Sequence, residues 1–310
     1  MSVEQALCCA SCGIAEIDDV KLKDCDGCDL VKYCNDECQV NHKSEHEEAC
    51  KKRAAELRDE LLFKQPESTH MGDCPICMLP LPLDMMKSSM CPSCSKVICK
   101  GCNHANNKRV KEQRLQQSCL FCREPVAKTK EEHFRRNMKR VEVNDPVAVC
   151  HEGVAQEKKG DYSKAFEYYT KAAELGDAEA HCKLARLYHF GQGVEKDWEK
   201  VIYHWEEAAI GGHPLCRFNL GSIESLNGNA ARAVKHWIIA ANLGQDESIK
   251  ELMRAFKRGE CSNDELASAL RAHKAAVDET KSPQRAAAAK AWPQRESAAK
   301  FWRIKCKVCK

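Results

Sequence analysis

Three similar segments of the chain end in KAAELG at residues 171–176, EEAAIG at 206–211 and IIAANLG at 238–244. The helix that leads to each of these ends is expected to begin at a polar residue, which is Asp161, Asp197 or Asn229. These starts lie 36 and 32 residues apart, and the loop at residues 191–194, which only the middle unit carries in full, explains the difference. A repeat of this length predicts a stack of helix pairs.

Small and aromatic residues recur in register across these units. The first helix of each unit carries a small residue, namely Gly153, Ala185 or Gly221, and the second carries an aromatic one, namely Tyr169, Trp205 or Trp237. This pattern resembles the SEL-like branch of the tetratricopeptide family over residues 146–245. The resemblance implies a mainly α fold, in which helix-turn-helix units form an extended right-handed α-solenoid whose concave surface binds proteins.

Two features complete the predicted solenoid. Residues 248–276 suit a divergent capping pair of helices, so the solenoid is expected to span residues 146–280. Cys150, Cys182 and Phe218 each lie three residues before the small residue of their unit, which predicts that these cysteines pack in the core.

A cysteine-rich stretch precedes the repeats. Its eight cysteines form four pairs with two residues between the members: Cys74 and Cys77, Cys91 and Cys94, Cys99 and Cys102, Cys119 and Cys122. This spacing lets a tight turn direct both sulfurs of a pair at one ion, and two pairs supply the four ligands of tetrahedral zinc. The sequence therefore predicts two closed zinc sites within residues 71–127.

The order of these pairs resembles a RING finger, in which the first and third pairs hold one ion and the second and fourth hold the other. The resemblance implies one site of Cys74, Cys77, Cys99 and Cys102 and a second of Cys91, Cys94, Cys119 and Cys122. It also implies that Ile76, Leu120 and Arg123 contact a ubiquitin-conjugating enzyme. The polar segment at residues 103–118 would form the central helix of the finger.

A second set of ligand pairs occupies the start of the chain: Cys9 and Cys12, Cys25 and Cys28, Cys34 and Cys38, His46 and Cys50. The last pair would share one face of a helix, because side chains at i and i+4 point the same way. Cys8 is an alternative to Cys9, and His42 is an alternative to His46.

This second set, with Tyr33 before the third pair and Gln39 after it, resembles a MYND finger. The resemblance implies one zinc site of Cys9, Cys12, Cys34 and Cys38 and another of Cys25, Cys28, His46 and Cys50, which gives four zinc ions in the chain. It also implies a docking module for short proline-rich peptides. The alternative is that the finger only folds and packs, because so short a segment lacks a sufficient core without metal.

The predicted organisation has six parts. They are a MYND-like finger at 1–50, a linker helix at 51–70, a RING-like finger at 71–127, an exposed connector at 128–145, the solenoid at 146–280 and a basic Ala-rich tail at 281–310. The tail holds nine Lys or Arg residues and one Glu, and it is expected to be flexible with some helix. Cys306 and Cys309 within it lack a second pair and are weak as a zinc site.

Composition limits the functions that remain. The 310 residues are 43% apolar and 31% charged, with a net charge of +3, as in an ordinary soluble protein. The sequence shows no membrane span and no secretory signal at MSVEQALCCA, so its 22 cysteines predict reduced thiols and metal sites in the cytoplasm or nucleus.

No nucleophile paired with a base, carboxylate pair or phosphate loop emerges from the sequence, so no catalytic residue is predicted. Two functions remain. The first is a RING-type ubiquitin ligase whose solenoid and MYND-like finger recruit protein substrates. The second is a non-catalytic scaffold for protein interactions; nucleic-acid binding and membrane association are not expected.

Overall fold

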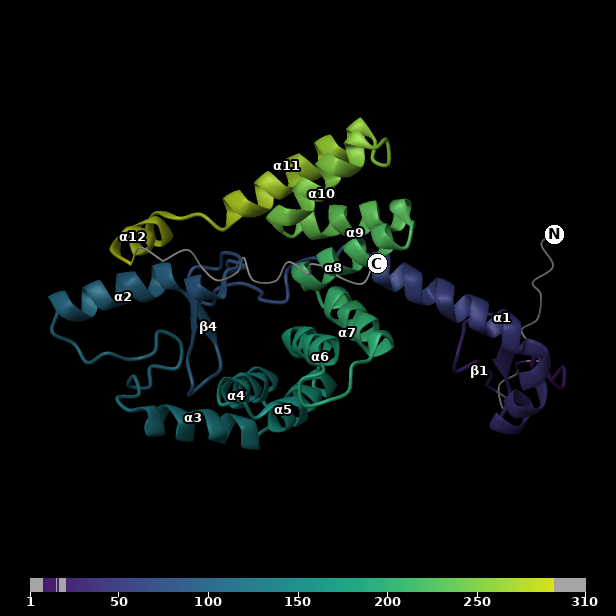
Figure 1. The fold of residues 1–310 in the computed structure, drawn as a ribbon. Coiled ribbons are helices and arrows are strands. Elements are labelled where there is room, and N and C mark those ends of the chain that lie inside the picture. Colours follow the sequence, from purple (N-terminus) through teal and green to yellow (C-terminus); the bar gives the residue numbers. More distant parts are fainter. Residues whose placement is uncertain (1–7, 15, 17–20, 293–310) are drawn as a thin grey trace. The chain divides into compact units, whose positions relative to one another are not determined.

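The computed structural model describes residues 8–14, 16 and 21–292 (Figure 1). The chain divides into two compact units, Met1–Lys64 and Gln65–Lys310. Helices dominate the described residues, and the paired helices of the second unit confirm the mainly α fold expected from the repeats. Among the described helices, none combines the length and the apolar character needed to cross a membrane.

The first unit combines a small hairpin with one long helix. Strand β1 (Lys23–Asp24) pairs antiparallel with β2 (Lys32–Tyr33), and helix α1 (Asp36–Phe63) follows. The side chain of Asn35 caps α1 by accepting a hydrogen bond from the N–H of Cys38 at 2.8 Å, which satisfies one of the free donors at the helix start. The linker helix predicted at 51–70 is the continuation of α1 as far as Phe63, where the helix ends.

The second unit begins with a small cysteine-rich segment, the second finger of the chain. It contains the 3-10 turn η1 (Met85–Lys87), the antiparallel strands β3 (Ser88–Met90) and β4 (Val97–Cys99), and helix α2 (Lys100–Glu112). Leu81 and Ile98 are buried together with cysteine side chains at its centre. Helix α2 starts at the third cysteine pair and covers much of the segment that was expected to be helical.

Helix α3 (Lys130–Glu142) occupies the segment predicted as an exposed connector. Asn137 and Val141 on α3 are buried, and Val141 belongs to the core of the first helix pair. The charged residues of this segment predict that it is exposed, but Asn137 and Val141, which lie one turn apart, pack inward. This segment is a packed helix at the edge of the solenoid.

Three helix pairs follow in the order predicted. They are α4 (Pro146–Lys158) with α5 (Tyr162–Glu174), α6 (Ala178–Phe190) with α7 (Trp198–Ile210), and α8 (Pro214–Leu226) with α9 (Ala230–Asn242). Asp161, Asp197 and Asn229 immediately precede the second helices, as expected. Helices α10 (Asp246–Lys257) and α11 (Asn263–Glu279) pack on α9 and form the predicted capping pair.

The small and aromatic positions of the repeats face one another across two of the three pairs. A Cβ atom added to Gly153 would lie 2.6 Å from the ring of Tyr169, and one added to Gly221 would lie 2.6 Å from Nε1 of Trp237. These distances are far below van der Waals contact. The aromatic rings are buried against the first helices because these two positions lack a side chain.

Helix α12 (Pro283–Ala291) packs against α2 of the second finger. Its Arg285 donates hydrogen bonds from Nη1 to the carbonyl oxygens of Pro80 and Thr280, each at 2.7 Å. The tail is expected to be flexible with some helix; its first part is a helix, and this helix is docked on the second finger. Residues 293–310, which include Cys306 and Cys309, lie outside the described residues.

Candidate metal centres

Four cysteine pairs adopt the same type of backbone turn. In each, the N–H of the first cysteine donates to the carbonyl oxygen five residues later: Cys9 to Ile14 at 2.8 Å, Cys74 to Leu79 at 2.9 Å, Cys91 to Lys96 at 3.0 Å, and Cys119 to Glu124 at 2.8 Å. The residue after the second cysteine has a positive φ, and these residues are Gly13, Met78, Ser95 and Arg123. This closed turn lets both sulfurs of a pair converge.

Helices position the remaining ligands. Cys99 caps α2, and its Sγ accepts a hydrogen bond from the N–H of Cys102 at 3.4 Å. On α1, Cys38 lies in the first turn, while His46 and Cys50 lie one turn apart further along. Side chains at i and i+4 share a helix face, so this spacing directs the imidazole and the thiol to one point.

The second finger brings its first pair together with its third and its second pair together with its fourth. The sulfur–sulfur distances are 3.9 Å for Cys74 and Cys102, 3.9 Å for Cys77 and Cys99, 4.0 Å for Cys91 and Cys122, and 4.0 Å for Cys94 and Cys119. Zn–S bonds of about 2.3 Å place tetrahedral sulfurs about 3.8 Å apart. Both groups therefore have the size and the crossed arrangement that a zinc pair requires.

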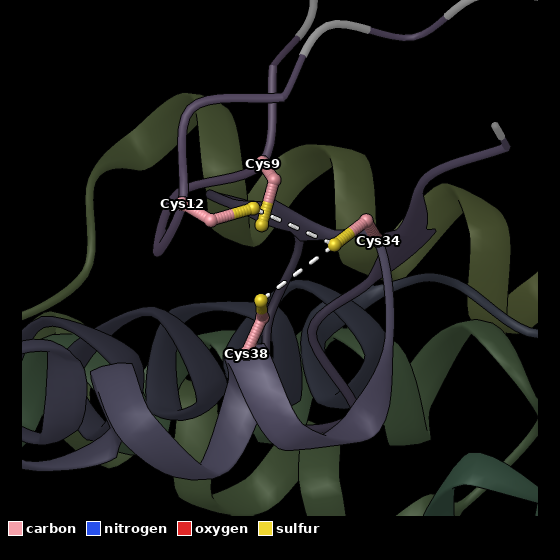
Figure 2. Close-up of side chains that lie close together, drawn as sticks. All are labelled: Cys9, Cys12, Cys34 and Cys38. Atoms are coloured by element: carbon pink, nitrogen blue, oxygen red, sulfur yellow. Dashed lines mark hydrogen bonds between the residues drawn. The ribbon is translucent and has the colours of Figure 1, made fainter.

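The first finger forms two further groups of the same kind. In the first, shown in Figure 2, the sulfur of Cys34 lies 3.6 Å from those of Cys12 and Cys38, with Cys9 beside them. In the second, the sulfurs of Cys25 and Cys50 are 3.8 Å apart, and Sγ of Cys28 lies 3.1 Å from Nε2 of His46. Within each of the four groups, the ligand atoms all lie within 4.8 Å of one another.

The structure also separates the alternatives at this finger. Cys8 is exposed, and the group contains Cys9 in its place. His42 stacks on His46 with ring centroids 5.7 Å apart, and its Nδ1 lies 3.0 Å from the hydroxyl of Tyr33. His42 thus packs beside the ligand group and is not part of it.

The crowding of the sulfurs explains why a cation is needed. Burial opposes ionisation of Cys9, but hydrogen bonds from backbone N–H groups outweigh it and lower the pKa of this thiol to about 6. Burial and the neighbouring sulfurs raise the pKa of Cys34 to about 12. Four thiolates so close repel one another, and a bound Zn²⁺ supplies the positive charge that lets all four ionise.

The three residues expected to contact a conjugating enzyme lie on the turns of the second finger. Ile76, which is 38% exposed, lies between the first two cysteines, and Arg123 is exposed directly after the last one. Leu120 is half-buried and packs against the core of the finger. Two of these side chains are thus accessible on turns whose geometry the metal groups fix.

A group that the sequence analysis did not identify lies in the solenoid. Ligand atoms of Cys182, His213 and Cys216 are within 4.8 Å of one another. Cys182 was expected to be a core residue only. The spacing of His213 and Cys216, with two residues between them, is the signal that could have identified this group.

Comparison with known proteins agrees with this description at two places. Residues 9–50 match the model of the MYND finger, and residues 149–177, 178–213 and 214–245 match the model of the Sel1 repeat. Residues 74–122 lie outside both matches. No curated protein matches the chain.

Two solved structures resemble part of the chain. A Sel1 repeat protein from Oxalobacter formigenes is 21% identical over 59% of this chain and 74% of its own, with a TM-score of 0.42. The protein c5321, a protective antigen of uropathogenic Escherichia coli with an SLR fold, is 22% identical over 56% of this chain and 38% of its own, with a TM-score of 0.37. The matched finger and the cysteine groups define a zinc-binding protein that also carries Sel1-type repeats.

Proposed function

We propose that this protein promotes ubiquitin transfer by holding a ubiquitin-loaded conjugating enzyme next to a bound protein substrate. The observation that carries the proposal is the pair of crossed four-cysteine groups in the second finger, with Ile76 and Arg123 exposed on their turns. In this account the conjugating enzyme binds the RING-like finger. The solenoid and the MYND-like finger bind protein partners, in the cytoplasm or nucleus.

The finger would act without forming a covalent intermediate. Each metal group would be saturated by four protein ligands, so none leaves the open position that zinc hydrolysis requires. Catalysis would come from proximity, because fixing the thioester in a reactive geometry removes entropy from the barrier. Four zinc ions, two per finger, would keep the contact surfaces in place.

Ile76, Leu120 and Arg123 would have distinct roles in this contact. Ile76 and the accessible part of Leu120 would bury apolar surface against the conjugating enzyme. The planar guanidinium of Arg123 can donate several hydrogen bonds at once, which suits it to bridge the conjugating enzyme and ubiquitin. Its left-handed backbone, with φ of 60°, projects this side chain from a closed turn.

One observation favours a non-catalytic scaffold as the second candidate. Arg285 of α12 donates from Nη2 to the carbonyl oxygen of Leu79 at 3.2 Å and lies 3.6 Å from Sγ of Cys77, the residue next to Ile76. The docked helix thus occupies part of the finger surface close to the proposed contact. A scaffold would have the same zinc groups and the same solenoid but would not transfer ubiquitin.

Self-ubiquitination of the purified full-length protein with a panel of conjugating enzymes separates the two candidates. Loss of charge-assisted hydrogen bonds worth about 1.5–3 kcal/mol predicts that Arg123→Ala slows transfer by about 10- to 100-fold. Ile76→Ala should also slow it. Met78→Ala is the matched control, because Met78 lies on the same turn and is 70% exposed. Inactivity of the wild type with every conjugating enzyme would favour the scaffold. Full activity of both variants would instead show that Ile76 and Arg123 do not make the contact with the conjugating enzyme.

A further inference from the structure

The group formed by Cys182, His213 and Cys216 lies where two successive repeats meet. Cys182 is on α6, Cys216 is on α8, and His213 is the residue that caps α8. Cys216 is fully buried and His213 is 5% exposed. Two soft thiol ligands and an imidazole within 4.8 Å form a donor set typical of zinc.

The repeats themselves show that packing does not require these residues. At the position of Cys216, the two preceding first helices carry Ala148 and Ala180, both fully buried. A methyl group is therefore enough to fill this position of the repeat. The thiol of Cys216 adds a metal ligand at a site where the architecture needs only a small side chain.

The cap of α8 departs from the repeat in the same way. Asp145 and Asp177 cap the two preceding first helices and accept the backbone N–H at 3.2 and 2.8 Å. His213 takes this position in α8, and its Nδ1 accepts from the N–H of Cys216 at 3.4 Å. Aspartate is a favoured capping residue and histidine is not. The histidine cap of α8 is therefore weaker than an aspartate cap would be, and its imidazole faces two thiols.

A carboxylate orients this imidazole from the other side. Oε2 of Glu179 lies 3.1 Å from Nε2 of His213, and Nζ of Lys183 lies 2.7 Å from Oε1 of Glu179. Nε2 faces the carboxylate, so a metal would bind at Nδ1, where it would replace the 3.4 Å hydrogen bond from the N–H of Cys216. Histidine ligands of metals generally donate their other N–H to a carboxylate or carbonyl oxygen, and this is the arrangement here.

The segment that leads into the second finger covers the group. The N–H of His70 donates to the carbonyl oxygen of Gly212 at 3.0 Å, and the rings of His70 and His213 stack with centroids 4.0 Å apart. A Cβ on Gly212 would lie 2.6 Å from the carbonyl oxygen of Ser68, so only glycine permits this close crossing. Nδ1 of His70 is buried without a hydrogen-bond partner among the described residues.

We propose that Cys182, His213 and Cys216 bind a zinc ion in the solenoid, separate from the ions of the two fingers. Two thiolates neutralise the charge of Zn²⁺, and the adjacent Glu179 and Lys183 neutralise each other, so the buried site carries no net charge. The ion ties α6 to α8 beneath the crossing segment at residues 68–70. Cys182, His213 and Cys216 supply three ligands to this site, which is independent of whether the protein transfers ubiquitin.

Zinc counting by native mass spectrometry of the full-length protein tests this proposal. Cys216→Ser and His213→Asn should each carry one zinc ion fewer than the wild type. The asparagine variant is chosen because asparagine caps helices well and does not replace the imidazole as a zinc ligand, so α8 should stay folded. Cys261→Ser is the matched control, because Cys261 is also buried but belongs to the capping pair, and its zinc count should equal that of the wild type.

Glu179→Gln supplies a second measurement. It leaves the three ligands in place and should weaken retention of this ion about 10- to 100-fold under chelator competition, as expected when the carboxylate partner of a ligating histidine is lost. Equal zinc counts in the wild type and in folded His213→Asn would overturn the proposal. So would an intact mass two hydrogens below the reduced value with a disulfide mapped to Cys182 and Cys216.

Discussion

At the scale of single residues, two of the helix pairs depend on a glycine, which has no side chain, in the first helix. Gly153 lies on α4 opposite Tyr169, and Gly221 lies on α8 opposite Trp237. In both pairs the aromatic ring fills the space that a Cβ atom would take. The recurrence of small and aromatic residues in the sequence therefore reflects direct contact.

Gly153→Ala should destabilise the solenoid by about 1–3 kcal/mol, because overpacking of a closely packed core displaces side chains and backbone. The measurement is the midpoint of thermal unfolding, followed by helical circular dichroism. The same substitution should cost much less in a protein that also carries Tyr169→Leu, whose smaller side chain leaves room for the methyl group. An equal cost in both backgrounds would show that the contact with Tyr169 is not the cause.

A partly buried ion pair between Glu157 on α4 and Arg186 on α6 makes the packing of these two helices sensitive to acid. Burial opposes ionisation of Glu157, but hydrogen bonds from Arg186 and Tyr169 outweigh it and lower the pKa of the carboxyl group. A carboxyl group with a lowered pKa in the folded state stabilises the fold above the unfolded pKa, and this contribution is lost as the pH falls through the folded value.

Thermal unfolding between pH 7 and pH 3 tests this contribution. The wild type should lose stability as the pH falls below the ordinary range of glutamate. Glu157→Gln should be less stable than the wild type at pH 7, and the difference should shrink as the pH falls. A difference that stays constant over this range would mean that the charge of Glu157 is not involved.

At the scale of elements, helix α1 supplies ligands to both metal groups of the first finger. Cys38 belongs to one group, while His46 and Cys50 belong to the other. The cap at Asn35 fixes where the helix starts, and the helical period then fixes where each ligand points. A single helix thus sets the positions of three of the eight ligands.

His46→Ala should remove one zinc ion from the protein, whereas His42→Ala should leave the zinc count unchanged. The two histidines lie one turn apart on α1, so each serves as the control for the other. Native mass spectrometry of both variants gives the result. Loss of zinc from the His42 variant alone would exchange the roles of the two residues.

Much of this architecture follows from spacing in the sequence. The two-residue gap within the cysteine pairs predicts the turns, and the repeat predicts the helix pairs. The docking of α12 could not be predicted in this way, because Arg285 and its partner Pro80 lie 205 residues apart. The burial of Asn137 could not be predicted either, because it depends on how α3 packs on the next helix, α4. The contact of His213 with Cys182 could not be predicted from the sequence, because Cys182 lies one repeat earlier and only the stacking of the repeats brings the two residues together.

At the scale of the whole molecule, two sources of stability act in different parts of the chain. The fingers at residues 9–50 and 74–122 have small cores made largely of cysteine, so metal ligation must supply most of their folding free energy. The helix pairs have buried apolar cores such as the one around Tyr169 and Leu184. Zinc therefore folds the fingers, while apolar packing folds the helices at the two ends of the repeats.

Hydrogen exchange of the full-length protein before and after chelation separates these two sources of stability. Because structural zinc contributes on the order of 10 kcal/mol to such modules, residues 9–50 and 74–122 should lose amide protection when the metal is removed. Helices α4, α5, α9 and α10 should keep their amide protection, because buried apolar cores stabilise them. Fingers that remain protected after verified removal of all zinc, or a loss of protection along the whole chain at once, would show that zinc and apolar packing do not act in separate parts of the chain.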